Sequence, residues 1–534
     1  MSNALERAIA TMAPQWGARR AAARQMFNAY EAADRTRTNK AKGSVMSGDM
    51  TAQIGGRSLR EQARWLDENH DLVTGIFDRL EERIVGADGM GVEPIPLTLD
   101  GKRHRELAKQ LKAEWAAWSL RPETTGEMTR PEMERLVVRS WLRDGEVLAQ
   151  EVRGRVPLYD HLTDVPYALE CLEADFMPIH FDDPGKGIFA GIERNAWRRV
   201  KAYHVYKQHP GDMKAFSLAT KRVPAENMIH LAHRKRLQQS RGISVLHAVI
   251  QRLADLKDYE ESERVAARIA AAMTMYIKKG EPHMYPDQGQ GGSGSKQAGQ
   301  SQLPTGARSI PIAPGMVFDG LMPGEDVGTI QSNRPSALLD GFRGAMVRAV
   351  AAGTRMGYST ANRDYNGTYS AQRQELVEAQ LGYDLLQGQF RDQWSRRVYR
   401  SFVDMAVASG RIKLPPDLDR STLYNAFYLG PVMPWIDPGR EADAWEQLVE
   451  AGFADESEVA RARGRNPQEL KQSREDEIAE NREKGLVYSS DAYHEYYGGK
   501  NGADQYGKLK PDTARDRNRK LRQSDGDGGN ENGD

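Results

Sequence analysis

The chain has 534 residues, 28% of them charged, and its 75 Lys and Arg balance its 75 Asp and Glu, so its formal net charge is zero. Because neutralisation of phosphates dominates affinity for DNA, this balance argues against tight, sequence-independent DNA binding, although weak or transient contact stays open. The single cysteine, Cys171, excludes an intramolecular disulfide and a cysteine-based zinc site, and no apolar run is long enough to predict a membrane helix.

The N-terminal part predicts a partly ordered arm followed by a helix. Residues 1–57 mix a short amphipathic stretch with one rich in Gly, Ser, Thr and Lys. The arm lacks the apolar core of a signal peptide, and with one cysteine the chain is expected in the cytosol. Ser58 is placed to cap the first clear helix, with Glu61 completing a capping box and Gly86 ending the helix.

The next segment changes from helical to strand-like periodicity. Helices are expected at 102–120 and 129–143, the second opened by a capping box of Thr129 and Glu132. Strand-like stretches follow, separated by Asp, Pro and Gly turns, and they predict a small, mostly antiparallel β region. These stretches are 146–153, 167–175, 187–194 and 200–208.

A long polar helix is the main feature of the middle of the chain. Residues 244–278 contain neither Pro nor Gly, and the pattern predicts one helix over 244–279, which would span roughly 50 Å. The middle of this helix is polar nearly all round, which is typical of a helix that bridges or packs in an array. Residues 287–303 are rich in Gly, Gln and Ser and predict a flexible insert.

The second half is predicted to be helical again. A helix rich in Ala and Arg is expected at 335–356, and Ser370 is expected to cap a long helix that runs to about Ser409. Asp437 and Pro438 are placed to open a further helix, and two short helices follow, the second opened by Asn466 and Pro467. From about residue 485 the chain is rich in Gly, Asn, Asp and Lys, and it is expected to be disordered.

Between the last two long helices lies a polar, tyrosine-rich stretch, GYSTANRDYNGTYSAQRQE (357–375). Tyr358, Tyr365, Tyr369 and Arg363 could stack on bases or contact phosphates. The alternative is a surface loop whose aromatic rings pack on a neighbouring helix, and the residue types alone favour this alternative.

Local motifs for catalysis and metal binding give no specific site. The sequence has no phosphate-binding P-loop, no Gly-x-Ser-x-Gly, no His-Glu-x-x-His and no Cys-x-x-Cys. One polar region could in principle ligate a metal, but its spacing matches no known ligand motif, and such residues are common in β turns. Its members are His161, Asp164, His180, Asp182 and Asp183.

Two other groups of residues have both a chemical and a structural interpretation. Cys171 alternates with apolar neighbours, which favours a core cysteine over a nucleophile, because no base is identified to activate it. His230 and His233 precede the basic run 234–236. This run could bind phosphate, but a solvated strand end or a donor of intersubunit salt bridges is the favoured interpretation.

Many stretches, taken together and in order, resemble the portal proteins of lambda-like tailed phages. The longest is PAENMIHLAHRKRLQQSRGISVLHAVIQRLADLKDYEESERVAARIAAAMTMYIKK, and the whole resemblance covers roughly residues 58–480. The N-terminal arm, the Gly/Gln/Ser insert and the C-terminal tail depart from the family pattern. The similar stretches are 58–86, 168–178, 191–195, 203–207, 224–279, 315–327, 364–380, 410–415 and 434–480.

The resemblance implies an α+β, mainly helical fold with an α/β wing, a helical stem, a small clip and a helical crown. The implied divisions are an N-terminal arm (1–57), a wing (58–243), a first stem helix (244–279), a clip with the flexible insert (280–325), a second stem segment with a tunnel loop (326–369), a long helix returning through the wing (370–436), a helical crown (437–484) and a disordered tail (485–534).

The resemblance also implies a function without catalysis or cofactor. Family members form a ring, usually of twelve subunits, at one capsid vertex, and double-stranded DNA is packaged and ejected through the ring. The implied partners are the terminase large subunit, the major capsid and scaffold proteins, and the head-completion or tail adaptor proteins. The implied location is the virion, with the host cytoplasm during assembly. The alternative is a metal-dependent nuclease of the packaging apparatus that uses an acidic cluster such as Asp182 and Asp183.

In such a ring, the segment 357–369 is expected to be a tunnel loop that projects toward DNA. A channel must not hold DNA tightly, since each phosphate contact has to break as DNA moves, and the zero net charge suits this role. A competing candidate for the tunnel loop is 328–336. The residues expected to line the channel are Tyr358, Arg363, Tyr365, Asn366 and Tyr369.

Overall fold

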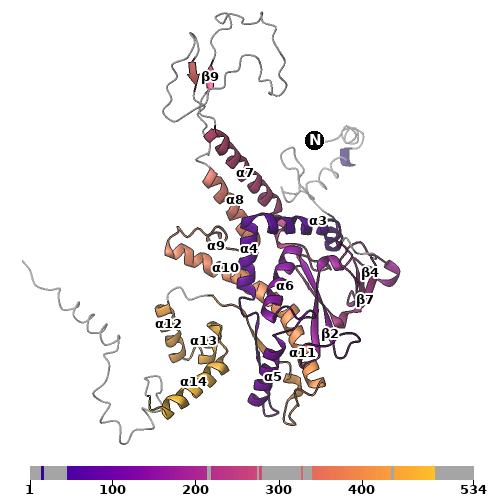
Figure 1. Cartoon of the computed structure of the whole chain (residues 1–534), viewed down its shortest axis with the longest axis vertical. Coiled ribbons are helices and arrows are strands. Elements are labelled where there is room, and N and C mark those ends of the chain that lie inside the picture. The colour runs from indigo at the N-terminus through magenta and orange to yellow at the C-terminus, as the bar shows by residue number, and fades with distance from the viewer. Residues whose placement is uncertain are drawn as a thin grey trace, which may run out of the picture. The chain divides into compact units, whose positions relative to one another are not determined.

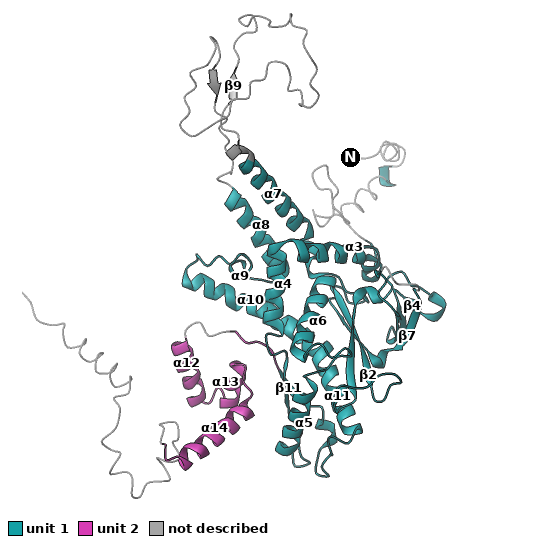
Figure 2. Cartoon of the chain, viewed as in Figure 1, with its two compact units in different colours: residues 1–428 teal, residues 429–534 magenta. Residues whose placement is uncertain are grey.

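The computed structural model describes residues 14–16, 45–212, 218–272, 276–278, 326–328, 339–433 and 438–486. The chain divides into two compact units, residues 1–428 and residues 429–534 (Figure 2). The described residues form mainly helices with four small sheets, so the predicted α+β, mainly helical class is confirmed. Among the described residues, no helix is both long enough and apolar enough to cross a membrane.

The first helices of unit 1 differ from the prediction at both ends. Helix α3 (Gly48–Asn69) begins well before Ser58, and the Ser47 hydroxyl caps it by accepting from the Met50 amide at 3.2 Å. Ser58 and Glu61 therefore lie inside the helix, and the predicted cap is wrong. The pattern missed this start because small residues, Ala52 and Gly56, occupy the buried face of its first turns.

The predicted helix to Gly86 is also interrupted. At His70 the backbone is extended, with φ −131° and ψ 109°, and a separate helix α4 (Asp71–Ile84) follows. His70 is the only residue between α3 and α4. The apolar residues keep their helical spacing on both sides of it, so the sequence pattern does not reveal the break.

Helices α5 (Arg105–Trp118) and α6 (Arg130–Asp144) match the predicted segments, and the capping box of Thr129 and Glu132 is present. Trp118 is fully buried, stacks on Tyr167 at 5.4 Å between ring centroids, and donates from its indole N–H to the Tyr167 carbonyl at 2.8 Å. Burial of large rings dominates core energetics, so this contact fixes α5 on the sheet.

The predicted antiparallel β region is confirmed and forms two sheets. The first has the order β3–β2–β8, and the second has the order β4–β5–β6–β7, with every pairing antiparallel. The first sheet shares the main core with the helices, whereas the second contributes to a smaller core around Met177 and Ile192. The strands are β2 (Glu146–Arg153), β3 (Tyr167–Glu173), β4 (Ile188–Phe189), β5 (Ile192–Arg194), β6 (Val200–Tyr206), β7 (Thr220–Pro224) and β8 (Met228–Ala232). A further pair joins β1 (Gly91–Pro94) to β11 (Ala426–Leu429).

The long polar helix is shorter than predicted. A 3₁₀ turn, η5 (Val245–Ala248), precedes α7 (Ile250–Ala272), and the strand β9 (Tyr276–Lys278) occupies part of the predicted helix 244–279. Strand β9 pairs antiparallel with β10 (Asp326–Gly328). Helix α7 runs beside α8 (Leu339–Thr354), and the pair projects from the body of unit 1 (Figure 1).

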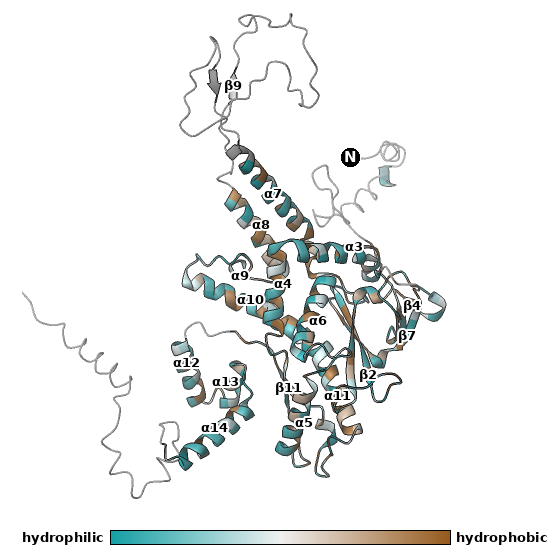
Figure 3. Cartoon of the chain, in the orientation of Figure 1, coloured by the Kyte–Doolittle hydropathy of each residue, from teal (hydrophilic) through white to brown (hydrophobic). Residues whose placement is uncertain are grey.

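After α8, the predicted loop contains a short helix, α9 (Tyr358–Asn362), and Thr368 rather than Ser370 caps the next helix. That helix is continuous from α10 (Tyr369–Phe390) through a π-helical turn (Arg391–Ser395) into α11 (Arg396–Ala408). Helix α11 buries one face against the main core, whereas hydrophobic and hydrophilic residues alternate along α10 (Figure 3).

Unit 2 consists of helices in its described part. They are α12 (Pro438–Glu450), α13 (Glu456–Ala462) and α14 (Pro467–Glu483). The predicted start of α12 at Pro438 and the cap of α14 at Asn466 are confirmed, the latter accepting from the Gln468 amide at 2.9 Å. The predicted flexible insert and C-terminal tail lie outside the described residues.

Candidate functional site

The tyrosine-rich stretch is anchored through Glu375 of α10. The Ser359 amide donates to Glu375 Oε1 at 2.8 Å, and the Ser359 hydroxyl donates to Oε2 at 2.5 Å. The first amides of a helix have no partner within the helix, so the Glu375 carboxylate caps α9. Its negative charge also interacts favourably with the positive N-terminal end of the helix dipole. A Cβ at Gly357 would lie 2.7 Å from Glu375 Oε1, so only glycine leaves room for this contact.

Tyr358 does not project from the protein. Its ring packs against the main core, with the Arg348 guanidinium 4.7 Å from the ring centroid, and its hydroxyl accepts from Asn362 Nδ2 at 3.3 Å. Arg343 donates to Asn362 and also to Glu260 at 2.8 Å, which ties α9 to both α8 and α7. Tyr358 therefore serves as an anchor, as the alternative interpretation of the loop expected.

The other four predicted residues lie together in an exposed loop, residues 363–369. Arg363 ends α9 in the left-handed conformation, with φ 52°. Asp364 Oδ1 accepts from Asn366 Nδ2 at 2.7 Å and from the Asn366 amide at 3.3 Å, which closes a tight turn. The side chains of Tyr365 and Tyr369 are 61% and 53% exposed. The 363–369 loop thus presents two rings, a cation and an amide to its surroundings. Of the competing candidate 328–336, only Gly328 lies within the described residues.

The structure does not bring the predicted metal ligands together. His161 Nε2 lies 2.7 Å from the Gly154 carbonyl, whereas Asp164 pairs with Arg411 at 3.2 Å. Asp182 accepts from Gln53 Nε2 at 2.7 Å and from the Ala190 amide at 2.6 Å. His180 is exposed, and Asp183 caps the turn η3 (Pro184–Lys186). Asp182 and Asp183 therefore hold loop structure, and the nuclease alternative gains no site from them.

A different group of possible ligands does converge, and no pattern along the chain indicated it. Ligand atoms of Glu173, Asp175 and His209 lie within 4.8 Å of one another. Arg60 and Arg64 already pair with Asp175, at 2.9 and 2.6 Å. Burial alone would raise the pKa of Asp175, but these guanidinium groups hold it below its usual range. Two arginines thus supply the positive charge that a metal ion would bring.

Cys171 and the two histidines have structural roles. Burial raises the pKa of the Cys171 thiol to about 12, so the thiolate needed by a nucleophile is absent at neutral pH. Burial also lowers the pKa of His233 to about 4, and its Nδ1 lies 3.0 Å from the Ile243 carbonyl. His230 Nε2 lies 3.0 Å from the buried carboxylate of Glu146. Neither imidazole joins the exposed cations at 234–236 in a phosphate site.

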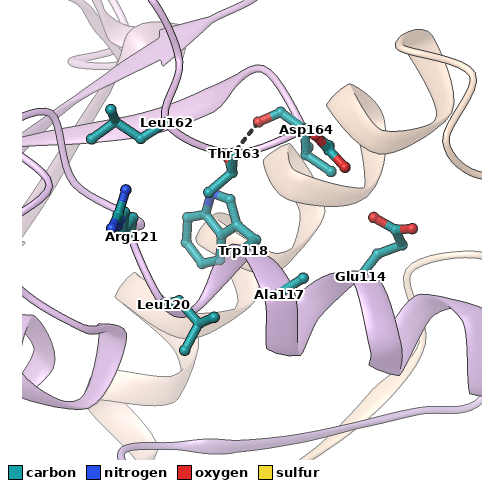
Figure 4. Close-up of a pocket in the computed structure, with 9 residues that line it drawn as sticks. Glu114, Ala117, Trp118, Leu120, Arg121, Leu162, Thr163 and Asp164 are labelled. Carbon is teal, nitrogen blue, oxygen red and sulfur yellow. Dashed lines mark hydrogen bonds between the residues drawn. The ribbon is translucent and has the colours of Figure 1, made fainter.

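A pocket of about 340 Å³ lies between the end of α5 and residues 162–165 (Figure 4). Trp118 and Leu162 line it, with Arg121 at one side and Glu114 and Asp164 at another. Both carboxylates pair with Arg411, and the Thr163 hydroxyl donates to the Val165 carbonyl at 2.9 Å. These contacts leave no acid–base pair aimed into the pocket, so it offers no reaction chemistry.

The profile of the phage portal proteins of the lambda family matches residues 34–387, which is more than half of the chain. The chain belongs to this family. The family predicted from the sequence is thereby confirmed. A curated relative, the probable portal protein of Halomonas phage phiHAP-1, is 23% identical over 427 residues, covering 77% of this chain and 78% of the relative.

Among solved structures, the chain is similar to one titled the neck of the native gene transfer agent (GTA) particle computed with C12 symmetry. The TM-score is 0.42 at 14% identity, covering 78% of this chain and 99% of that chain. It is also similar to a chain of the virion of the native GTA particle, with a TM-score of 0.39 at 13% identity, covering 79% of this portal-family chain and 99% of the other.

Proposed function

We propose that this chain assembles into a homo-oligomeric portal ring, of twelve subunits as the resemblance implies, through which double-stranded DNA is packaged and later ejected. Membership of the portal family carries the proposal. In this assignment unit 1 supplies the wing and the stem, and helices α12 to α14 of unit 2 supply the crown. The ring acts as a conduit without catalytic turnover, in the virion and, during assembly, in the host cytoplasm.

The projecting pair of α7 and α8 supports a ring. In α7, Leu253 and Leu256 near the base are buried, whereas most residues of 261–268, the described stretch of the outer half, are exposed. The outer part is joined to α8 by the Tyr259–Phe342 ring contact, with centroids 4.9 Å apart, and by the Arg343–Glu260 ion pair. A helix pair that buries so little of its own surface gains stability by packing beside equivalent pairs, as staves do in a barrel.

The 363–369 loop is proposed to face the DNA. Tyr365 and Tyr369 offer exposed rings and Arg363 offers a cation, while the neutral chain avoids the many phosphate contacts that would hold DNA in place. Anchoring by Glu375 and Tyr358 keeps the loop attached while its tip stays exposed. The proposed partners are the terminase large subunit, the major capsid and scaffold proteins, and the head-completion or tail adaptor proteins.

Negative-stain electron microscopy with mass photometry on the purified protein tests the ring. Rings with a central hole, and a mass near a dozen chains of 59.8 kDa, are the expected result. A monomer or dimer under all conditions, including added scaffold protein, would overturn the ring. The next experiment would then be a Mg²⁺-dependent nuclease assay, in which a conduit is expected to show no turnover and a nuclease is expected to cleave DNA.

A further inference from the structure

Two arginines occupy backbone positions that usually belong to glycine. Arg355 follows the end of α8 with φ 61°, and Arg363 follows the end of α9 with φ 52°. Both complete the same C-terminal helix motif. The amide of the residue after each arginine donates to a carbonyl five residues earlier, at 3.0 Å after Arg355 and at 3.2 Å after Arg363. This motif needs a left-handed residue, and any side chain is strained there because its Cβ crowds the following carbonyl oxygen.

Other helices in the described part of the chain have glycine at this place. Helices α4, α6, α11, α12, α13 and α14 are each followed, within two residues, by a left-handed glycine, which adopts the conformation without strain. These residues are Gly86, Gly145, Gly410, Gly452, Gly464 and Gly485. The arginines after α8 and α9 therefore keep a strain that glycine would relieve. Backbone strain of this kind is concentrated at functional sites, which points to a role for the two side chains.

A third left-handed arginine shows what a structural role looks like. Arg198, with φ 62°, pairs with Asp49 at 2.7 Å and donates to the Gln238 side chain at 3.1 Å, so it links the turn between β5 and β6 to α3 and to a second loop. Arg355 and Arg363 are exposed, and within the ranges that the structure describes their guanidinium groups form neither an ion pair nor a hydrogen bond. Packing within the chain therefore does not explain why these two positions hold arginine.

Both arginines lie on one stretch of backbone that runs along α10. At one end, Arg355 packs on Gly382, where an added Cβ would lie 3.2 Å from the Arg355 Cβ. At the other end, just after Arg363, the Tyr365 carbonyl accepts a hydrogen bond from Gln372 Nε2. The two contact points on α10 are ten residues apart, roughly 15 Å along the helix axis. Helix α10 thus holds both cations in place on the segment that leads to the exposed tyrosines.

The surroundings of Arg355 carry positive charge without a counter-charge. Burial and, after it, the neighbouring Arg355 lower the pKa of Lys235 in the loop after β8. Like Arg355, Lys235 forms no ion pair with any residue that the structure describes. Like charges held near each other favour an anion, because an anion relieves their repulsion. The anion has to come from outside the described part of the chain.

We propose that Arg355 is a DNA-contacting residue of the channel, and that its guanidinium and that of Arg363 bind backbone phosphates of the passing duplex. The inference rests on the proposed function and adds a residue outside the 363–369 loop to the DNA-contacting surface. It explains the strain, since glycine would suit the backbone at both places but would remove the charge. Phosphate contacts carry no sequence information, so a duplex of any sequence suits this site.

Substitution by glycine separates the role of the side chain from that of the backbone. Arg355→Gly removes the guanidinium and relieves the left-handed strain, so the thermal unfolding midpoint should not fall. The affinity of assembled rings for a DNA duplex should fall. The slope of log affinity against log salt concentration should become shallower by about 0.9 for each phosphate contact that is lost. Fluorescence anisotropy of a labelled duplex, titrated with rings at several salt concentrations, measures both quantities.

Four further variants serve as matched controls. Leu158→Gly relieves the same strain at an exposed, uncharged residue with φ 66°, so it should leave the affinity and the slope unchanged. Arg121→Ala removes an exposed cation after α5 and should change the slope far less than Arg355→Gly. Arg198→Gly loses its ion pair and should lower the thermal unfolding midpoint. Arg355→Lys keeps the charge and should keep the slope.

The outcomes separate this inference from the proposed function. Arg355→Gly rings with the wild-type affinity and slope would overturn the inference, and if Arg363→Gly rings still bound less tightly, the DNA-facing loop would stand without Arg355. A slope change no larger than that of Arg121→Ala would also contradict it, because any exposed cation would then have the same effect. So would wild-type rings that bind no duplex even at low salt. A wild-type chain that forms no ring would refute the proposed function and this inference together.

Discussion

Glu146 is the buried charge on which the loop between β8 and η5 depends. Its carboxylate accepts from Arg241 Nε at 2.7 Å and from the Gly242 amide at 2.9 Å, and both ionic side chains are almost fully buried. Arg241 also donates to the carbonyls of Ala190 and Met177, at 2.8 and 3.0 Å. Burial alone would raise the pKa of Glu146, but Arg241 and His230 hold it well below its usual range.

Replacing this carboxylate is expected to destabilise unit 1. Glu146→Gln leaves Arg241 as a buried cation without a counter-charge. Removing one partner of a buried ion pair lowers the free energy of unfolding by about 3–5 kcal/mol. Urea unfolding followed by tryptophan fluorescence measures the loss. The control is Glu61→Gln, which breaks the exposed Arg57–Glu61 pair and is expected to change stability by less than about 0.5 kcal/mol. Equal effects of the two substitutions would contradict the role assigned to Glu146.

His233 makes the stability of the fold depend on pH. Burial lowers its pKa to about 4 in the folded chain, whereas an unfolded histidine titrates near pH 6.5. Between these values the unfolded chain binds the extra proton, so stability falls as the pH falls from about 6.5 to 4, by roughly 3 kcal/mol in total.

The substitution His233→Gln removes this titration while keeping a donor for the Ile243 carbonyl. As the pH falls from about 6.5 to 4, the wild type should therefore lose stability relative to the variant. The difference between their unfolding free energies should stop changing below about pH 4. Urea titrations at several pH values measure it, with the exposed His180→Gln as control. A difference that stays constant across this pH range would contradict the assignment.

Among the elements, those with strong local signals were predicted well. The capping box at Thr129, the antiparallel strands and the cap at Asn466 depend on residues close together in sequence, so the pattern shows them. Helix α9 was predicted as loop because its cap, Glu375, comes from the next long helix, and no local pattern reveals such a partner. The start of α3 was missed because its buried positions hold Ala and Gly, which give no apolar periodicity.

The contact of Glu375 with α9 leads to a prediction at the scale of this element. Glu375→Ala removes the acceptor for the Ser359 amide and hydroxyl, and loss of a helix cap costs about 1 kcal/mol. A helix as short as α9 gains little stability from its own backbone hydrogen bonds, so it depends on side-chain contacts such as this one. Hydrogen–deuterium exchange of residues 357–362 should therefore be faster in Glu375→Ala. The control is Arg373→Ala, at an exposed position on the same helix as Glu375, and it should leave this exchange rate unchanged. Unchanged protection in Glu375→Ala would show that α9 does not need this cap.

At the scale of the whole molecule, the sequence indicated the correct family, but it did not show which residues of the candidate site are packed on the core and which are exposed. Tyr358 has the same residue type as Tyr365 and lies in the same polar stretch, yet core packing and Arg348 remove it from the surface. Glu173 and His209 likewise meet only through folding. Such groupings depend on tertiary contacts, which spacing along the chain does not encode.

The remaining prediction concerns the 363–369 loop in the assembled ring. Tyr365 is 61% exposed at its tip, so a photo-crosslinking phenylalanine derivative placed there should react with DNA caught during packaging. The same derivative at Leu99, which is 72% exposed on a turn after β1, should react far less, because exposure alone does not bring a side chain to the channel. Equal crosslinking from both positions, or a ring structure with Tyr365 on its outer surface, would remove this loop from the channel. Crosslinks from Tyr365 but not from Leu99 would assign a DNA contact to the 363–369 loop.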